Sequence, residues 1–206
     1  MNILGLLISF GLLLLAMSFH EFAHGFVAYR LGDNTAKYSG RLTLNPLAHI
    51  DPIGTVLLPL SLFIITRGQF IFGAAKPVPI NYWALKNPKQ DMVWIGLSGP
   101  GANFALAFVL SMVLRFIPAD IVLLDSLLRN FIIINVILGV FNLIPIPPLD
   151  GSRVLMGLLP RGLAAPYSAI EPFGFFILVI LLMAGVFDIL VWPAVRIICG
   201  WLGIPL

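Results

Sequence analysis

Two histidines and a glutamate near the N-terminus form the residue pattern with the clearest chemical meaning. His20, Glu21 and His24 stand in the run HEFAH, which has the spacing HExxH. Side chains four residues apart lie on the same face of an α-helix, so both imidazoles can bind one zinc ion. The glutamate between them can accept a proton from a metal-bound water. The motif therefore predicts a hydrolytic zinc centre.

The depth of this motif in an apolar segment favours a functional role. His20 lies ten residues before Arg30, which corresponds to about 15 Å along a helix axis. Ionisable side chains that far into an apolar helix are costly and usually serve a function. A polar helix end, where the same side chains only cap the helix or reach toward water, is the less favoured interpretation.

The third zinc ligand has two candidates. A catalytic zinc usually has three protein ligands and an open position for water, and His49 is the only histidine outside the motif. Asp150 is the preferred candidate, because it follows an apolar segment in which an unpaired carboxylate would be hard to keep ionised. An ordinary Asp-Gly turn is the alternative for Asp150. For His49 we expect an accessory position in a loop near the mouth of the site.

Two further runs accompany the HExxH motif. Asn142–Gly151 reads NLIPIPPLDG, and Gly99–Asn103 reads GPGAN. Together the motifs resemble those of the site-2 proteases, which are polytopic intramembrane zinc metalloproteases, in a short form without a PDZ-like or nucleotide-binding regulatory domain. The resemblance implies that the substrates are membrane-embedded protein segments. It also implies three ligands for one zinc ion and a general base: His20, His24 and Asp150, with Glu21 as the base.

Hydrolysis also needs groups that handle the oxyanion and the substrate backbone. The oxyanion requires a hydrogen-bond donor besides the metal, and the candidates are Asn142 and Asn103. Asn142 could instead hold the substrate backbone or simply satisfy a buried carbonyl. The three prolines between Asn142 and Asp150 prevent a regular helix there. An extended segment at this point could pair with an unwound substrate.

The composition indicates that a membrane protein positions these groups. The chain has 206 residues, of which 60% are hydrophobic and 10% are charged, whereas soluble domains are about 25% charged. We predict an all-α polytopic membrane protein with one domain over residues 1–206. It should be a bundle of about four to six transmembrane or re-entrant segments, with a small irregular or β-like loop region. Cys199 is the only cysteine, so an internal disulfide is excluded.

Four apolar segments are long enough to cross a bilayer as helices, which takes roughly 20 residues. They lie at residues 3–29, 92–117, 130–149 and 172–192. The first carries HExxH, and the third is predicted to end in the Asp-Gly motif. Residues 30–91 are predicted to form a loop and a re-entrant segment, because their apolar run at 53–66 is short and flanked by prolines. A weak alternating pattern at 37–44 suggests a strand pair.

A shared zinc site constrains the topology. The 3–29 and 130–149 helices must run in the same direction, so residues 53–75 must return to the face they left. Lysines and arginines lie mainly on the side of the proposed active site, which the positive-inside rule places in the cytoplasm. That side carries Arg30, Lys37, Arg41, Arg67, Lys76, Lys86, Lys89, Arg153 and Arg161, against Arg115 and Arg129 opposite.

These observations predict a multi-pass protein of the cell membrane that cleaves peptide bonds in transmembrane segments with one Zn²⁺ per chain. Its expected partners are membrane-embedded protein substrates and the lipid bilayer. Nucleic acid is not expected, because the basic residues form no patch, and the oligomeric state stays open. Two other functions fit the metal motif: a zinc-dependent membrane hydrolase with a non-peptide substrate, and a metal transporter.

Overall fold

Helices dominate the chain, as its composition predicts. The computed structural model describes residues 3–65, 73, 75–118 and 120–206, and within these ranges it contains helices and loops but no strand. Four helical stretches in the described residues are long and apolar enough to cross a membrane; they lie at residues 4–30, 88–114, 122–142 and 162–183. The prediction of an all-α polytopic membrane protein is therefore confirmed.

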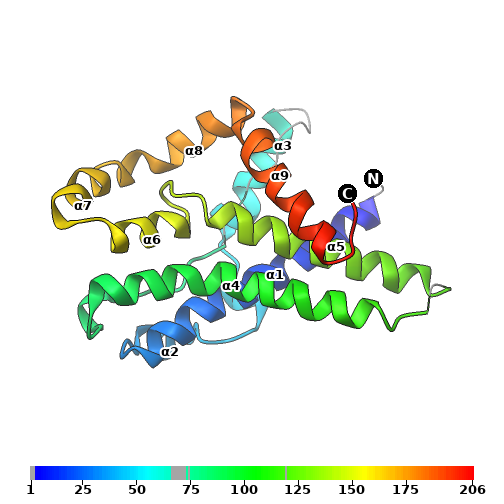
Figure 1. Ribbon diagram of the computed structural model, residues 1–206, viewed down its shortest axis with the longest axis horizontal. Helices are drawn as coiled ribbons and strands as arrows, with labels where there is room; N and C mark the ends of the chain where they lie inside the picture. Colours follow the sequence, from blue (N-terminus) through cyan, green and yellow to red (C-terminus); the bar gives the residue numbers. More distant parts are fainter. Residues whose placement is uncertain (1–2, 66–72, 74, 119) are drawn as a thin grey trace.

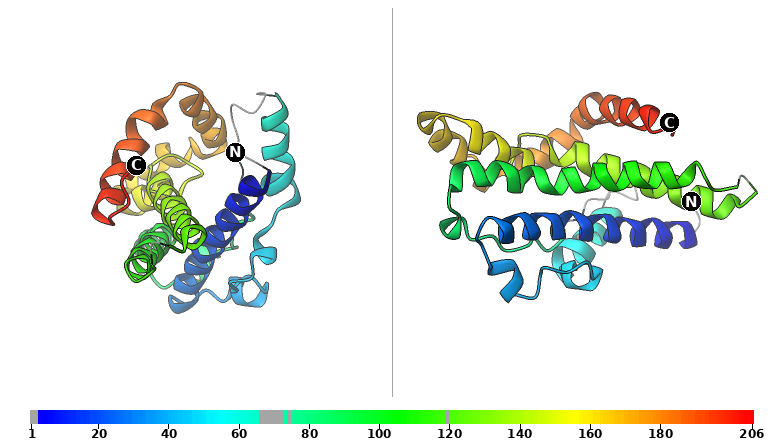
Figure 2. Two further views of the ribbon diagram at one scale, coloured as in Figure 1. Left: turned by 90° about the vertical axis from the view of Figure 1, so that its right-hand side faces the viewer. Right: turned by 60° about the horizontal axis from the view of Figure 1, so that its bottom comes forward.

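Three long helices form the centre of the bundle. Helices α1 (Ile3–Arg30), α4 (Pro88–Leu114) and α5 (Val122–Asn142) pack against one another. The chain runs along α1, returns along α4 and turns again into α5, so α1 and α5 run in the same direction (Figures 1 and 2). This is the arrangement that a site shared by α1 and the end of α5 requires.

The Asp-Gly motif lies at the start of a helix and not at the end of one. Helix α5 spans Val122–Asn142 instead of the predicted 130–149, and a bent segment over residues 143–149 follows it. Asp150 then begins α6 (Asp150–Leu158). The prolines of the bent segment explain the difference, because they cannot continue the hydrogen bonding of α5. A carboxylate in the first turn of a helix is also favoured by the helix dipole.

The predicted helix at 172–192 is broken. The structure has α7 (Arg161–Ser168), a 3₁₀ turn at Glu171–Phe173, α8 (Gly174–Met183) and α9 (Val186–Trp201). The break between α8 and α9 falls at Gly185, whose φ of 71° is a left-handed conformation that glycine adopts readily. The apolar composition continues across this break and therefore conceals it. Helix α9 packs on α5 through Val195 and Cys199.

The segment between α1 and α4 is irregular. Its elements are α2 (Thr35–Tyr38), a 3₁₀ helix at Pro46–His49, a π-helix at Pro52–Leu57, α3 (Leu58–Ile65) and a 3₁₀ turn at Tyr82–Ala84. The strand pair predicted at 37–44 is wrong. Residues 35–38 form a helical turn instead, and Gly40 (φ 68°) follows it.

The two ends of the predicted re-entrant segment lie together. The backbone N–H of Lys76 donates to the carbonyl oxygen of His49 at 2.9 Å, so the chain comes back to the point it left. Residues 66–72 and 74, which belong to this segment, lie outside the described residues. A dip into the membrane needs this return, and the membrane position of the segment stays a prediction.

Candidate metal centre

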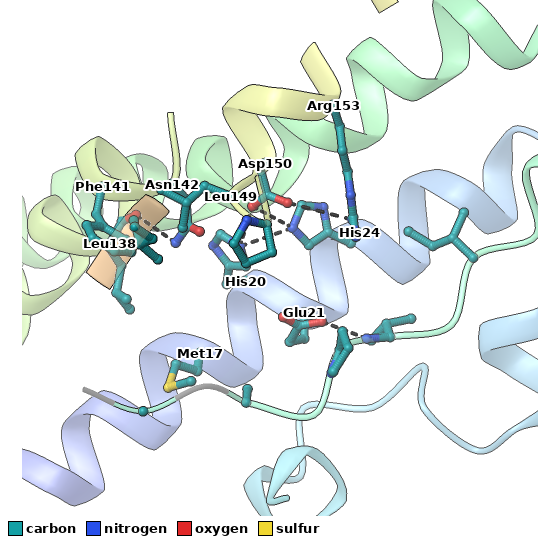
Figure 3. Close-up of a pocket in the computed structure, with 17 residues that line it drawn as sticks. Met17, His20, Glu21, His24, Leu138, Phe141, Asn142, Leu149, Asp150 and Arg153 are labelled. Atoms are coloured by element: carbon teal, nitrogen blue, oxygen red, sulfur yellow. Dashed lines mark hydrogen bonds and ion pairs between the residues drawn. The ribbon is translucent and has the colours of Figure 1, made fainter. Parts of the chain in front are cut away.

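His20, His24 and Asp150 come together between α1 and the start of α6. The Nε2 atoms of the two histidines are 3.0 Å apart, and Oδ2 of Asp150 lies 2.9 Å from His20 Nε2 and 3.1 Å from His24 Nε2. All three residues are buried, with exposed fractions of 6%, 3% and 6%. Figure 3 shows the carboxylate above the two rings. Asp150 is 130 positions from His20 and 126 from His24 in the sequence, yet the three residues present their ligand atoms to one point.

The spacing of these atoms fits a zinc ion. Tetrahedral zinc with bonds of 2.0–2.1 Å separates its ligand atoms by roughly 3.3 Å, and the observed separations are 2.9–3.1 Å. Each histidine also uses its other ring nitrogen elsewhere. His24 Nδ1 donates to the carbonyl of Ile95 at 2.7 Å. This bond fixes the tautomer in which Nε2 has its lone pair free for a metal.

A chain of two asparagines orients His20 in the same way. The amide nitrogen of Asn103 donates to the carbonyl of Ala16 at 3.2 Å and to Oδ1 of Asn135 at 2.9 Å. Its Oδ1 is therefore the atom that accepts from His20 Nδ1, at 2.6 Å. Asn135 in turn donates to the carbonyl of Phe131. Both asparagines are fully buried, so the proton on His20 is held at Nδ1 and Nε2 faces the metal position.

Helix α4 approaches the two histidine rings so closely that only glycine fits. A Cβ atom on Gly99 would lie 2.6 Å from His20 Nε2 and nearer still to His24 Nε2. A second close approach fixes Asp150, because a Cβ on Gly151 would collide with the carbonyl groups of Leu143 and Ile144. Gly99 of the GPGAN run and Gly151 of the LDG run therefore allow α4 and the bent segment to pack directly against the site.

Glu21 lies below the histidine pair and contacts the chain that returns from the predicted re-entrant segment (Figure 3). Its Oε2 accepts the backbone N–H of Val78 at 2.8 Å. The same stretch is held by Asp33, a fully buried carboxylate whose Oδ2 accepts the N–H of Asn81 at 2.7 Å. Glu21 is thus positioned beside the metal cluster by a backbone donor and stays accessible to the cavity.

A cavity of about 280 Å³ opens on the cluster. Its polar wall contains Glu21 and the three candidate ligands, together with Asn142 and Arg153. Its apolar wall comes from several elements: Met17 of α1, Pro77 and Val78 of the returning chain, Leu138 and Phe141 of α5, and Leu178 of α8. The cavity therefore offers an apolar chain a path to a polar reaction centre.

Burial and the histidines act in opposite directions on Asp150. Burial alone would raise the pKa of its carboxyl group, but charge interactions and hydrogen bonds with His24 and His20, in the protonated form whose proton a metal ion would replace, hold that pKa below its ordinary value. The carboxylate is consequently ionised, which is the form that binds a metal ion.

The remaining sequence candidates have different positions. Asn142 lines the cavity beside His20, with its amide nitrogen donating to the carbonyl of Leu138 at 3.0 Å. Asn103, expected to contact the oxyanion or the substrate, instead lies behind His20 and does not line the cavity. His49 is buried in its 3₁₀ helix, where Nε2 lies 2.9 Å from the carbonyl oxygen of Thr43. It belongs neither to the cluster nor to the cavity wall among the described residues.

The bent segment before Asp150 uses several of its own carbonyl groups. Those of Ile144 and Ile146 accept backbone N–H groups within the segment, and that of Pro145 accepts the Tyr167 hydroxyl at 2.9 Å. A substrate strand would have to share or displace these bonds, so pairing with this segment stays a prediction.

Sequence reasoning missed Asn135, Asp33 and Arg153. Asn135 lies in an apolar helix, where a buried amide is costly unless it is hydrogen-bonded, and this was a usable signal. Arg153 follows Asp150 by three residues and shares its helical face. The importance of Asp33 had no signal in the sequence, since its partner Asn81 is 48 residues away.

Comparisons with known proteins find relatives that are named zinc metalloproteases, which agrees with a candidate zinc site. The family model of peptidase family M50 matches residues 119–185. The Bacillus subtilis protein named "Putative zinc metalloprotease YwhC" is 37% identical over 189 residues, which cover 88% of this chain and 82% of that protein. The Mycolicibacterium smegmatis protein named "Putative zinc metalloprotease Rip2" is 32% identical over 82% of this chain and 64% of its own length. No solved structure matches.

The chain is therefore a zinc metalloprotease built on membrane-length helices. It belongs to peptidase family M50, as the identity and the extent of its match to YwhC show. The resemblance to the site-2 proteases noted from the motifs is confirmed, as are the zinc cofactor and the multi-pass membrane character.

Proposed function

We propose that the chain cleaves peptide bonds inside the transmembrane segments of membrane proteins, with its active site toward the cytoplasmic side of the cell membrane. The observation that carries this proposal is the depth of the site. The candidate ligands His20 and His24 are buried on a membrane-length helix, well before its end at Arg30. A substrate bond that reaches them must itself lie within the apolar part of the bundle.

The residues of the cluster divide the chemistry of peptide hydrolysis. His20, His24 and Asp150 would hold the zinc, which when bound supplies a water of lowered pKa and polarises the scissile carbonyl. Glu21 accepts the proton of the attacking water and delivers it to the leaving amine. The N–H of Val78 keeps the Glu21 carboxylate in place for both transfers.

The orientation in the membrane rests on charge. The lysines and arginines of residues 30–91 and 150–171 outnumber Arg115 and Arg129 on the other side, and such an excess marks the cytoplasmic face. The return of the chain from His49 to Lys76 supports the topology, because it puts both flanks of the intervening segment on one side.

The test is cleavage by the purified, zinc-loaded protein in lipid vesicles. The substrates are a panel of single-span membrane peptides. The control for each is a soluble peptide with the same flanking sequences, in which a polar sequence replaces the apolar span. We expect cleavage within the apolar span, inhibition by a zinc chelator, and loss of cleavage in Glu21→Gln with zinc retained. Zinc flux that survives in Glu21→Gln, without cleavage by the unmutated protein, would instead indicate a transporter.

A further inference from the structure

Hydrolysis in this cavity needs a donor for the oxyanion, and Asn142 commits one of its two amide N–H groups elsewhere. Its amide nitrogen already donates to the carbonyl of Leu138, 3.0 Å away. Because a backbone carbonyl can only accept, this bond identifies the nitrogen of the amide and leaves one N–H of that nitrogen uncommitted. A cationic donor that lines the same cavity would stabilise the negative oxygen that develops during hydrolysis more strongly than the remaining N–H of this neutral amide.

Arg153 is a cationic donor in the wall of this cavity. It is the only lysine or arginine among the described residues that line the cavity. Its Nη1 is 3.8 Å from Oδ1 of Asp150, the carboxylate oxygen that faces away from the two histidines. In Figure 3 the arginine side chain runs down beside His24, whereas Asn142 lies beside His20 and Glu21 lies below both rings.

The contact between Arg153 and Asp150 leaves most of the guanidinium free. A distance of 3.8 Å is too long for a hydrogen bond, and the Arg153 side chain is 34% exposed. Helix α4 passes close to the stem of Arg153 at Gly96, where an added Cβ would lie 3.4 Å from the Cβ of Arg153. The guanidinium has five N–H donors in a planar fork, and carboxylate-like groups match this geometry.

We propose that Arg153 is a catalytic residue that donates hydrogen bonds to the scissile carbonyl oxygen as it becomes an oxyanion, and then to the carboxylate of the product. This role rests on the proposed peptide hydrolysis. The water oxygen bonds to the carbonyl carbon, and the π electrons move to the carbonyl oxygen that Arg153 faces. When the carbonyl reforms, the C–N bond breaks and the amine leaves with the proton carried by Glu21. The new carboxylic acid then releases the second proton of the water to solvent and becomes the carboxylate. Arg153 keeps all its protons throughout.

A structural role for Arg153 predicts a different result. If the arginine only held Asp150 in place, its removal would weaken zinc binding and leave the affinity ratio between transition-state and ground-state ligands unchanged. Loss of an oxyanion donor should instead weaken binding of a tetrahedral ligand and leave zinc binding and affinity for the intact substrate unchanged. The donor acts on the tetrahedral species and not on the metal or the intact substrate.

The test compares Arg153→Ala, Arg153→Gln and Arg153→Lys in the full-length, zinc-loaded protein, with Arg129→Ala as a matched control. Arg129 pairs with Asp125 at the start of α5 and does not line the cavity. The probe is a phosphinic peptide, whose tetrahedral phosphorus carries the negative oxygens of the intermediate. Its dissociation constant is measured beside zinc content, and an uncleaved membrane peptide is titrated into each variant in a Glu21→Gln background.

We expect Arg153→Ala to bind the phosphinic peptide about 10²- to 10³-fold more weakly, with zinc content and affinity for the uncleaved peptide unchanged. Arg153→Lys should recover part of the loss, and Arg129→Ala should show none. Zinc loss in Arg153→Ala, or unchanged phosphinic-peptide affinity, would overturn the role of Arg153. If the unmutated protein binds the phosphinic peptide but cleaves no membrane segment, the proposed function fails while the comparison of the variants still decides on Arg153.

Discussion

Replacement of Asn103 tests how the buried hydrogen-bond chain prepares His20 for zinc. Asn103→Ala removes the acceptor of the 2.6 Å bond from His20 Nδ1. It also leaves Asn135 Oδ1 and the carbonyl of Ala16 without the donor they share. The imidazole can then rotate or take the other tautomer. Loss of such an outer partner typically lowers metal affinity 10- to 100-fold, which is about 1.4–2.7 kcal/mol.

Asn103→Asp separates the two functions of this side chain. The carboxylate still accepts from His20 Nδ1, but it cannot donate to Ala16 or Asn135. We expect its zinc affinity to exceed that of Asn103→Ala. Its thermal stability should fall, because Asn135 Oδ1 loses its donor and an unpaired buried acceptor costs about 1–3 kcal/mol. Asn135→Ala, which removes only the support of Asn103, should lower zinc affinity less than Asn103→Ala does.

The assay is equilibrium competition for zinc with a chromophoric chelator at several chelator concentrations. Ser111→Ala is the matched control. Ser111 is buried on α4, like Asn103, but among the described residues its hydroxyl bonds only to the carbonyl of Phe108 in the same helix. It should leave zinc affinity unchanged. Equal zinc affinity in Asn103→Ala and the unmutated protein would refute the claim that Asn103 orients His20.

Two further predictions concern packing and topology. Gly99→Ala should reduce zinc binding at least about tenfold, because its Cβ would collide with both histidine rings, and overpacking of this kind costs about 1–3 kcal/mol. Gly101→Ala, with nothing within 4 Å of the added Cβ, should bind zinc normally; equal affinities in zinc titrations would contradict this packing argument. Single cysteines at Asn87 and Asp125, in a Cys199→Ser background, should react with an impermeant reagent from opposite faces of oriented vesicles. Labelling of both from one face would rule out the parallel course of α1 and α5 across the membrane.

The proximity of His20, His24 and Asp150 was predictable because its signals are local. HExxH spacing puts His20 and His24 on one helical face wherever the helix lies, and the apolar run before Asp150 makes an isolated carboxylate implausible there. Parallel α1 and α5 followed from the need to bring these groups together. None of this depended on knowing how the side chains of different helices pack.

The parts that were not predictable depend on packing and on helix ends. Asn103 was expected in the cavity, but its position behind His20 is decided by the closeness of α4 to α1, which Gly99 permits. Hydropathy placed the Asp-Gly motif at a helix end, because the apolar composition continues past Asn142. The prolines gave a better signal: they end α5 early and let Asp150 begin α6, which in turn puts Arg153 on the same face.

Metal analysis of three proteins tests the central claim most directly. The unmutated chain and Glu21→Gln should each contain about one zinc ion per chain after identical loading and washing, since a single three-ligand site is expected. Asp150→Ala should retain far less zinc, because only two of the three expected ligands, His20 and His24, remain. Full zinc in Asp150→Ala, or loss of zinc in Glu21→Gln, would contradict the assignment of Asp150 as a ligand and of Glu21 as the general base.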